Sequence, residues 1–331
     1  MAEKHVLVDI QNLRMYFAVA KGLFSSETLT LRAVDDVSFS IKRGETLGLV
    51  GESGCGKTTV ARCILKLYQP TDGKVIFEGK DITNISARKM RRLRKDMQII
   101  FQDPYSSLDP RMKVGDIVGE PLLVHGVANA SERSEIVFNL LRTVGLAPDH
   151  YYRFPHEFSG GQRQRIGVAR ALALNPKFVV ADEPVSALDV SIQAQILNLL
   201  QDLQSELHLT YLIVAHDLGV IRHLALSTAV MYVGKLVEKA PTEELFHNPS
   251  HPYTEALISA VPSLDLQKKM NRLILRGDVP SPIFPPPGCR FSPRCIYARS
   301  KCSKQEPPLE EISPGHFVAC HFPLEESEYA Y

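Results

Sequence analysis

Hydrophobic and polar positions alternate near the start of the chain and later give way to short apolar runs separated by amphipathic segments. Alternation over residues 6–10 and 34–41 predicts two strands of a sheet, and the intervening stretch 18–31, with its glycine and several Ser and Thr, predicts a long hairpin connection. Further on, the apolar runs 178–181 and 211–215 are typical of buried parallel strands. Other short strands are expected at residues 46–50, 75–77 and 97–101.

Amphipathic segments between these runs predict helices that alternate with the strands. The helices are expected at residues 57–67, 86–95, 131–144, 159–174 and 191–208, and Ser86 stands at the N-cap position of the second. Strands and helices that alternate after residue 45 predict an α/β fold with parallel strands in its sheet. The proline-rich segment 279–288 predicts a stiff linker, so the last forty residues are expected to form a separate small module.

Composition places the chain among ordinary globular proteins. Its 331 residues are 44% hydrophobic and 23% charged, enough for one large domain with an appendage or for two modest domains. A net charge of +1 gives no overall attraction to nucleic acid or to an anionic membrane. No apolar run approaches the roughly 20 residues of a membrane span. The first ten residues, MAEKHVLVDI, lack the apolar core of a signal peptide, so we expect a cytoplasmic location.

A glycine-rich motif follows the predicted strand 46–50. Gly51–Thr58, with the sequence GESGCGKT, fits the pattern G-x-x-x-x-G-K-[ST] and leads into a predicted helix. Glycines allow backbone N–H groups to curl around phosphate oxygens, while Lys57 reaches the β- and γ-phosphates and the Thr58 hydroxyl binds Mg²⁺. A glycine-rich turn alone can be only a tight turn, but the full motif in this context favours nucleotide binding. The predicted contacts are Gly51, Glu52, Ser53, Gly54, Cys55, Gly56, Lys57, Thr58 and Thr59.

Two carboxylates end the apolar strand 178–181. Asp182 is suited to hold Mg²⁺ through its second coordination shell, and Glu183 to polarise a water molecule beside the γ-phosphate. The alternative is an acidic pair at the surface, which is common at strand ends. The phosphate-binding motif earlier in the chain favours the catalytic interpretation.

Four more motifs resemble those of ABC-type ATPases, in that family's order and spacing. They are Gln102 in IIFQDP, Phe158-Ser-Gly-Gly-Gln162, Ser186-Ala-Leu-Asp189 and His216 in IVAHD. The resemblance covers roughly residues 5–240, and its one departure is Phe158 where Leu is commoner. It implies a P-loop ATPase domain over 1–245 with a mixed sheet, an antiparallel β subdomain and a helical subdomain at about 103–175.

The same resemblance implies a reaction shared between two subunits. Two such domains close head to tail around two ATP molecules, so the helix that Ser159 opens faces ATP held by the other subunit. Glu183 is the expected general base, and His216 contacts the γ-phosphate and positions the water. Gln102 is expected to sense water and Mg²⁺, and the residues expected at the Mg²⁺ ion are Thr58, Gln102 and Asp182. Phe17 is expected to stack on adenine, with Tyr16 or simple strand packing as alternatives. Further nucleotide contacts are expected at Ser159, Gly160, Gly161, Gln162 and Asp189.

The end of the chain resembles a narrower branch, the ATPases of oligopeptide and dipeptide importers. His251-Pro-Tyr-Thr254, the forms SGGQRQR and QDPYSSLDPR, and the proline-rich segment before the cysteines carry this resemblance. It implies import of di- or oligopeptides by two ATPase subunits, two membrane permeases and an external solute-binding protein, with no nucleic acid. The chain is then expected to be peripheral, at the cytoplasmic face of the cell membrane. Nickel or another small solute, a soluble ABC-type ATPase, and a metal-binding redox sensor remain as alternatives.

Two surface segments have proposed contacts under this resemblance. The loop 103–112 is where the family docks a short permease helix, although turn-rich loops often have no special role. The basic run 88–95 is expected either to be a solvated helix face or to contact the inner leaflet or a permease.

Four of the six cysteines crowd into the expected C-terminal extension, 246–331. Their spacing, Cys289-x5-Cys295-x6-Cys302-x17-Cys320, lacks the tight C-x(2–4)-C pairs usual for structural zinc. We therefore expect a [4Fe–4S] cluster, with Zn²⁺ next and free thiols or disulfides last. His316 and His321 are substitute ligands, whereas Cys55 and Cys63 are expected to be packing residues. Because so small and proline-rich a segment buries little core, a metal centre would hold it folded.

Overall fold

The computed structural model describes residues 5–21, 28–261 and 273–325. They divide into two compact units, one drawn from residues 1–42, 46–84 and 215–331 and the other from residues 43–45 and 85–214. The ends of the two domains expected from the sequence, residues 1–4 and 326–331, lie outside the described residues, as does 22–27 of the expected hairpin connection.

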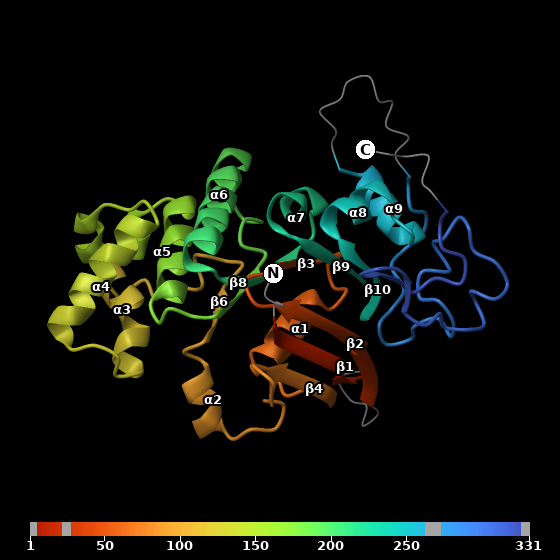
Figure 1. Ribbon diagram of the computed structural model, residues 1–331, viewed down its shortest axis with the longest axis horizontal. Helices are drawn as coiled ribbons and strands as arrows, with labels where there is room; N and C mark the ends of the chain where they lie inside the picture. The colour runs from red at the N-terminus through yellow and green to blue at the C-terminus, as the bar shows by residue number, and fades with distance from the viewer. Residues whose placement is uncertain (1–4, 22–27, 262–272, 326–331) are drawn as a thin grey trace. The chain divides into compact units, whose positions relative to one another are not determined.

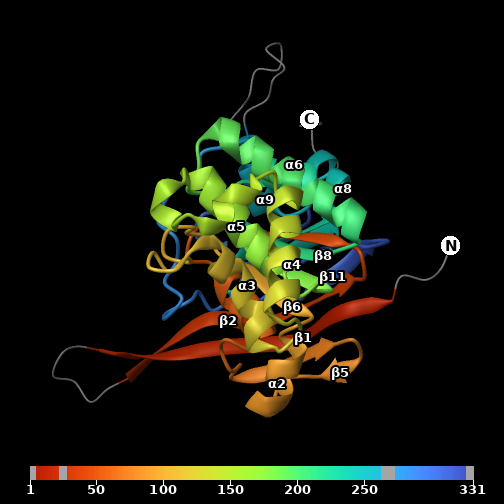
Figure 2. The same cartoon turned by 90° about the vertical axis from the view of Figure 1, so that its left-hand side faces the viewer.

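An antiparallel β subdomain opens the first unit. Its strands run in the order β2-β1-β4-β5, with bounds β1 Val6–Ala20, β2 Thr28–Lys42, β4 Asp72–Phe77 and β5 Lys80–Asp81. β1 and β2 pair as far as Ala20 with Thr28, which makes a long ribbon (Figure 2). Both strands are thus longer than the sequence predicted, and much of the expected connection is strand. The far half of the ribbon is exposed or half-buried. Its β2 part alternates Thr and Leu over residues 28–31, but the glycine and the Ser and Thr residues of 18–31 favoured a connection instead.

A mixed sheet forms the rest of the first unit. β3 Thr46–Val50 lies parallel to β9 Ser227–Tyr232. The next strands pair antiparallel in turn: β9 with β10 Lys235–Pro241, β10 with β12 His316–Val318, and β12 with β11 Glu310–Ser313. The helices of this unit are α1 Lys57–Ile64, α7 Leu218–Leu224, α8 Thr242–His247 and α9 Pro252–Ser259. The hairpin of β11 and β12 therefore extends the same sheet as β9 and β3, and a separate C-terminal module is not confirmed.

The second unit combines three parallel strands with helices. β8 Thr210–Ala215, β7 Phe178–Asp182 and β6 Met97–Ile100 lie side by side in that order. The helices are α2 Ala87–Leu93, α3 Val114–Val124, α4 Ala130–Thr143, α5 Gly160–Leu172 and α6 Val190–Leu207, with 3-10 turns at Pro148–Tyr152 and Pro155–Glu157. α3, α4 and α5 pack against one another (Figure 1). Apart from α3, these helices were expected from the sequence, within a few residues at each end.

Buried strands place the sequence motifs at strand ends. Every residue of β3, β7 and β8 is buried, as their apolar runs predicted. The loops that follow the carboxyl ends of parallel strands are where α/β sheets position their ligands. Gly51 follows β3, Gln102 follows β6, Glu183 follows β7 and His216 follows β8. In each unit, therefore, the polar motifs stand at the carboxyl ends of buried strands.

Candidate functional site

The phosphate-loop motif forms a tight loop between β3 and α1. Lys57 is 4% exposed, and its Nζ donates to the carbonyl oxygens of Gly51 at 2.6 Å and Glu52 at 3.0 Å. Ser53 and Gly54 form the exposed tip of the loop. The buried lysine thus stands at the centre of the loop, with its cation held by backbone oxygens that a phosphate is able to replace.

Glycine is required at both ends of this loop. Gly51 and Gly56 have φ angles of 151° and 106°, which side-chain-bearing residues rarely adopt. A Cβ at Gly51 would meet the carbonyl oxygen of Met231, and one at Gly56 would meet that of Ala33. The loop therefore turns sharply at Gly51 and leads directly into the N-terminus of α1, a position that favours an anion.

Gln102 and Glu183 meet at the ends of neighbouring strands. β6 and β7 are parallel, with Ile100 opposite Ala181, so the residues that follow them lie at one edge of the sheet. Gln102 Nε2 donates to Glu183 Oε2 at 3.0 Å. The sequence predicted both as site residues but not their direct contact.

Backbone contacts hold Glu183 in place. Its N–H donates to the carbonyl of Val214 at 2.9 Å, and its carbonyl accepts from Ser186 Oγ at 3.1 Å. Its φ of 46° is unusual for a residue with a side chain and costs energy that the surrounding contacts must offset. Asp182, 4% exposed, is the last residue of β7. The strand end therefore presents one buried and one partly exposed carboxylate.

The signature helix α5 begins at a capping box. Ser159 Oγ accepts from the N–H of Gln162, and Gln162 Oε1 accepts from the N–H of Ser159 at 3.1 Å. Gly161 packs against α6, where a Cβ would strike Ile192. Ser159 itself is exposed, so the N-terminus of α5 is open to a ligand. Ser86, by contrast, occupies an N-cap position but makes no side-chain capping bond.

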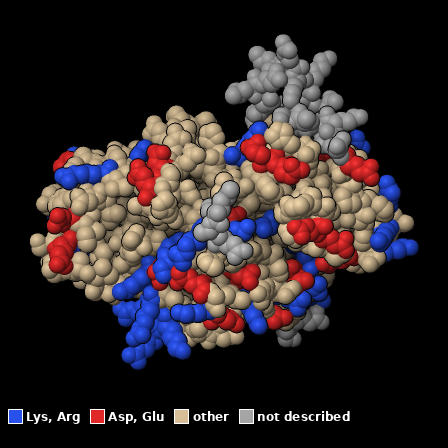
Figure 3. Space-filling view, in the orientation of Figure 1, with Lys and Arg blue, Asp and Glu red and all other residues tan. Residues whose placement is uncertain are grey.

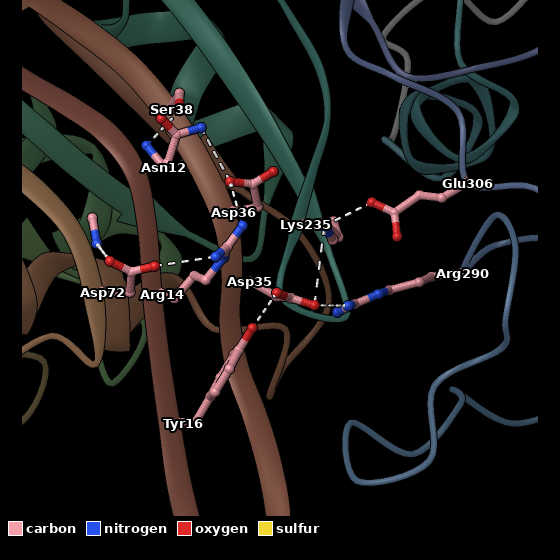
Figure 4. A network of polar contacts seen from close by, with 11 residues as sticks. Asn12, Arg14, Tyr16, Asp35, Asp36, Ser38, Asp72, Lys235, Arg290 and Glu306 are labelled. Carbon is pink, nitrogen blue, oxygen red and sulfur yellow. Dashed lines mark hydrogen bonds and ion pairs between the residues drawn. The ribbon is translucent and has the colours of Figure 1, made fainter.

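The remaining predicted residues of the nucleotide site have different surroundings. Asp189 lies exposed at the N-cap of α6, and His216 is exposed after β8. The Phe17 ring contacts the Tyr68 ring edge-on, with centroids 5.6 Å apart. Tyr16 instead donates its hydroxyl to Asp35 at 2.6 Å, which holds its ring to β2 (Figure 4). The hydroxyl bond thus fixes the Tyr16 ring, whereas the Phe17 ring carries no hydroxyl and packs edge-on against Tyr68.

The four C-terminal cysteines line one cavity of about 20 Å³ together with His251. All six cysteines of the chain are free thiols, and Cys55 and Cys63 are buried, as expected of packing residues. Burial raises the pKa of Cys295 and that of Cys320 to about 11, so without a metal these thiols are protonated at neutral pH. Within the described residues, no three His, Cys, Asp or Glu side chains are arranged to hold a single metal ion. The predicted metal site is therefore not shown.

Two arginines beside these cysteines reach the β strands and the phosphate loop. Arg290 donates to Asp35 and to the carbonyl of Val233, while Lys235 pairs with Glu306 at 2.7 Å (Figure 4). Arg294 forms a two-pronged ion pair with Glu52. Neither arginine was predicted from the sequence as a functional residue. Each stands directly beside a cysteine, Arg290 after Cys289 and Arg294 before Cys295, which is the only local signal of their role.

Asp35 is stabilised in its charged form by this network. Burial alone would raise the pKa of its carboxyl, but the Tyr16 hydroxyl and the Lys235 and Arg290 cations together outweigh burial and lower that pKa. The hydrogen bond and burial also raise the pKa of Tyr16 to about 12. Asp35 therefore remains an anion that ties the cysteine-bearing segment to β2.

Two surface features lie on the second unit. Lys and Arg gather over α2 (Figure 3), where Arg91 also donates to the carbonyl of Val124 at 2.9 Å. A cavity of about 560 Å³ lies beside the predicted permease-docking loop and is lined in part by Arg111, Leu123 and Val124. Leu123 is 62% and Val124 48% exposed, so apolar surface is available at this hollow. Across the described ranges, no helix is both long and apolar enough to cross a bilayer.

Curated relatives match nearly all of this chain, and two family models match parts of it. A model described as "ABC transporter" matches residues 34–186, and one described as "Oligopeptide/dipeptide transporter, C-terminal region" matches residues 237–302. The oligopeptide transport ATP-binding protein AppF of Bacillus subtilis is 50% identical over 97% of this chain and 98% of its own length. A putative peptide import ATP-binding protein of Brucella ovis is 53% identical over 90% of this chain and 94% of its own.

Solved structures of similar fold cover 71–73% of this chain. The dimeric post-hydrolysis state of the ATP-binding cassette MJ0796, bound to ADP and Pi, has a TM-score of 0.64 and 28% identity over 71% of this chain and 99% of its own. CbiO1 from Clostridium perfringens, part of the ABC transporter complex cbiONQ, has a TM-score of 0.63 and 26% identity over 73% of this chain and 90% of its own.

Proposed function

The chain belongs to the ABC transporter ATPases, in the branch of oligopeptide transport ATP-binding proteins, and we propose that it hydrolyses ATP to drive import of di- or oligopeptides. The match to AppF over nearly the full length of both chains, at 50% identity, supports peptide as the cargo class. The same match includes the C-terminal region, which a generic ATP-binding cassette lacks. Nickel or another small solute is the second candidate, since importers of this branch differ in cargo.

The contact between Gln102 and Glu183 carries the catalytic part of this proposal. A general base must lie within hydrogen-bond reach of a water that its neighbours orient. Gln102 Nε2 donates to Glu183 Oε2 at 3.0 Å, which orients the carboxylate. A water that enters between these two groups would contact both the base and the amide that orients it. Glu183 then removes the proton from the attacking water, while His216 contacts the γ-phosphate and orients the water.

ATP binding is assigned to residues 51–59, with Phe17 against the adenine. Lys57 leaves the carbonyls of Gly51 and Glu52 to pair with phosphate oxygens, and the loop N–H groups donate to the same phosphates. Thr58, Gln102 and Asp182 provide oxygen groups of the kind that Mg²⁺ prefers, directly or through water. When bound, the ion neutralises the charge that develops on the phosphates.

Each ATP site is completed by a second ATPase subunit. The open N-terminus of α5 at Ser159, with Gly160, Gly161 and Gln162 behind it, serves the ATP of the partner subunit, and Asp189 lies at the same contact. The partner is a copy or a paralogue. The dimeric MJ0796 structure, similar over 99% of that chain, supports this arrangement.

The other subunits of the transporter are two membrane permeases and an external solute-binding protein. The hollow beside the loop 103–112, which charged as well as apolar side chains line, accepts a short permease helix through the exposed Leu123 and Val124. We assign the basic face of α2 (Figure 3) to a contact with the inner leaflet or a permease, the alternative being a solvated helix face. The chain is thereby held at the cytoplasmic face of the cell membrane by its partners.

The C-terminal extension, residues 246–331, holds a [4Fe–4S] cluster through Cys289, Cys295, Cys302 and Cys320. This proposal is supported by the four thiols that line one cavity and form no disulfide with each other. Because that cavity has a volume of only about 20 Å³, room for about one water molecule, the cysteine-bearing loops would have to move apart to admit the cluster. The bound group would cross-link four positions of a segment that has little core of its own. Zn²⁺ is the alternative occupant, and metal analysis of anaerobically purified protein distinguishes the two.

The substitution Glu183→Gln tests the catalytic proposal. Removal of the base while the shape is kept should leave ATP binding intact, abolish hydrolysis and trap an ATP-bound dimer. ATP binding is measured by calorimetry, hydrolysis by phosphate release, and dimerisation by size-exclusion chromatography with ATP. Glu206→Gln, at an exposed position on α6, is the matched control. Near-normal turnover in Glu183→Gln would refute the assignment of the base.

A further inference from the structure

Glu52 of the phosphate loop is held from three sides. Arg294 Nη1 donates to Glu52 Oε2 at 2.7 Å and its Nη2 donates to Oε1 at 3.1 Å. The N–H of Glu52 donates to the Tyr253 hydroxyl at 2.8 Å, and its carbonyl accepts from Lys57 at 3.0 Å. Two of the three partners come from the C-terminal region, 201 and 242 positions along the chain.

Both remote partners are themselves held in place by aromatic packing. Tyr253 is fully buried, with its ring 4.6 Å from Tyr232 and 5.4 Å from Phe291. Arg294 also donates to the Tyr232 hydroxyl at 3.3 Å, and its side chain is 8% exposed. A two-pronged guanidinium–carboxylate pair fixes direction as well as distance. Glu52 is therefore oriented by groups that are rigid before any nucleotide arrives.

Charge gives this contact a consequence for nucleotide binding. Glu52 is the only acidic residue of the loop GESGCGKT, whose other features attract an anion. Like charges a few ångströms apart near a protein surface repel by several kcal/mol at an effective dielectric constant of about 20. An unpaired carboxylate at this point would thus oppose a triphosphate. Paired with Arg294, Glu52 adds no net charge to the loop.

We propose that Arg294 and Tyr253 are positioning residues for ATP: they neutralise and orient Glu52, so that the cysteine-bearing segment sets the affinity of the phosphate loop. This inference rests on the proposed assignment of residues 51–59 to the phosphates of ATP. Neither residue contacts the nucleotide in this account. Both act through Glu52, Arg294 on its side chain and Tyr253 on its backbone N–H.

The test measures ATP affinity by calorimetry in the full chain for four variants. Arg294→Gln should weaken ATP binding about tenfold, since it exposes the Glu52 carboxylate to the phosphates. Glu52→Gln should bind ATP more tightly than the wild type, because it leaves the Arg294 cation unpaired beside the loop. The double variant should recover most of the affinity lost in Arg294→Gln. Arg299→Gln, an exposed arginine of the same segment, is the matched control and should bind normally.

Further measurements separate positioning from folding and from the site assignment. In the assembled transporter, Arg294→Gln should raise the KM for ATP and leave kcat within about twofold. If Arg294→Gln does not fold, Tyr253→Phe, which keeps the buried ring, should still weaken ATP binding. Equal losses in Arg294→Gln and the double variant, or weaker binding in Glu52→Gln, would overturn the inference. Lys57→Ala tests the site itself, because normal ATP affinity in that variant contradicts the loop assignment rather than the role of Arg294.

Discussion

Glu238 on β10 anchors the C-terminal region, and its replacement by alanine should be strongly destabilising. The residue is fully buried and accepts three hydrogen bonds. Its Oε1 accepts from the N–H of Ser250 at 2.7 Å and from His316 Nε2 at 2.7 Å, and its Oε2 accepts from the N–H of His251 at 3.0 Å. One carboxylate thereby joins the segment before α9 and the strand β12 to the mixed sheet.

The expected magnitude follows from the donors left without a partner. In Glu238→Ala, two backbone N–H groups and one imidazole N–H remain buried, and each unsatisfied donor costs about 1–3 kcal/mol. We expect a loss of about 3–6 kcal/mol in the free energy of unfolding, allowing for partial relaxation and water entry. His316→Ala should cost less, since Glu238 keeps both backbone donors.

Urea unfolding followed by circular dichroism measures this loss, and limited proteolysis shows where the chain opens first. Cleavage should begin between β10 and β12, where the three bonds are lost. Glu310→Ala, at an exposed position on β11, should change stability by less than about 0.5 kcal/mol. A loss below about 1 kcal/mol in Glu238→Ala would refute the reasoning, because buried donors would then be satisfied without the carboxylate.

Two further predictions concern the same region. The pKa of Asp35 is lowered in the folded protein, so its stabilisation is complete above the unfolded-state pKa of about 3.9 and is lost as the pH falls through the lower folded value. Asp35→Asn should therefore melt well below the wild type at pH 7, with a difference that shrinks below about pH 4; a difference independent of pH would contradict this. Treatment with a chelator should make residues 289–320 sensitive to protease. ATP should still bind to the treated protein, with an affinity no lower than the affinity of Arg294→Gln for ATP. A metal-free tail as resistant as the untreated one would argue against a structural metal.

Local patterns predicted the parts of the site that lie within single strand ends. The apolar run before Asp182 and Glu183 predicted β7 and its terminal carboxylates, and the structure places both there. The motif Gly51–Thr58 likewise predicted a strand–loop–helix unit, and β3, the loop and α1 form it. The family inferred from six ordered motifs is confirmed by the matches to ABC transporter proteins. Each of these features depends on residues close together in the sequence.

Long-range pairing accounts for what the sequence did not predict. The outer half of β1 and β2 is held by cross-strand pairing rather than by a buried face, and the Thr–Leu alternation at residues 28–31 was outweighed by the glycine and serines of the expected connection. Helix α3 contains Pro121, a residue that usually argues against a helix interior. Arg294 and Glu52 are 242 positions apart, and no local spacing connects them. Such contacts follow from the folded sheet and not from any short motif.

ATP-driven peptide uptake is the most direct test of whether this chain powers peptide import. The chain, assembled with its partner ATPase and permeases in proteoliposomes that contain the solute-binding protein, is supplied with Mg-ATP and a labelled tripeptide. The account predicts that peptide accumulates only with hydrolysable ATP and that Glu183→Gln abolishes accumulation although ATP still binds. Uptake at the wild-type rate in Glu183→Gln, or ATP hydrolysis by the wild type that moves no peptide, would contradict it.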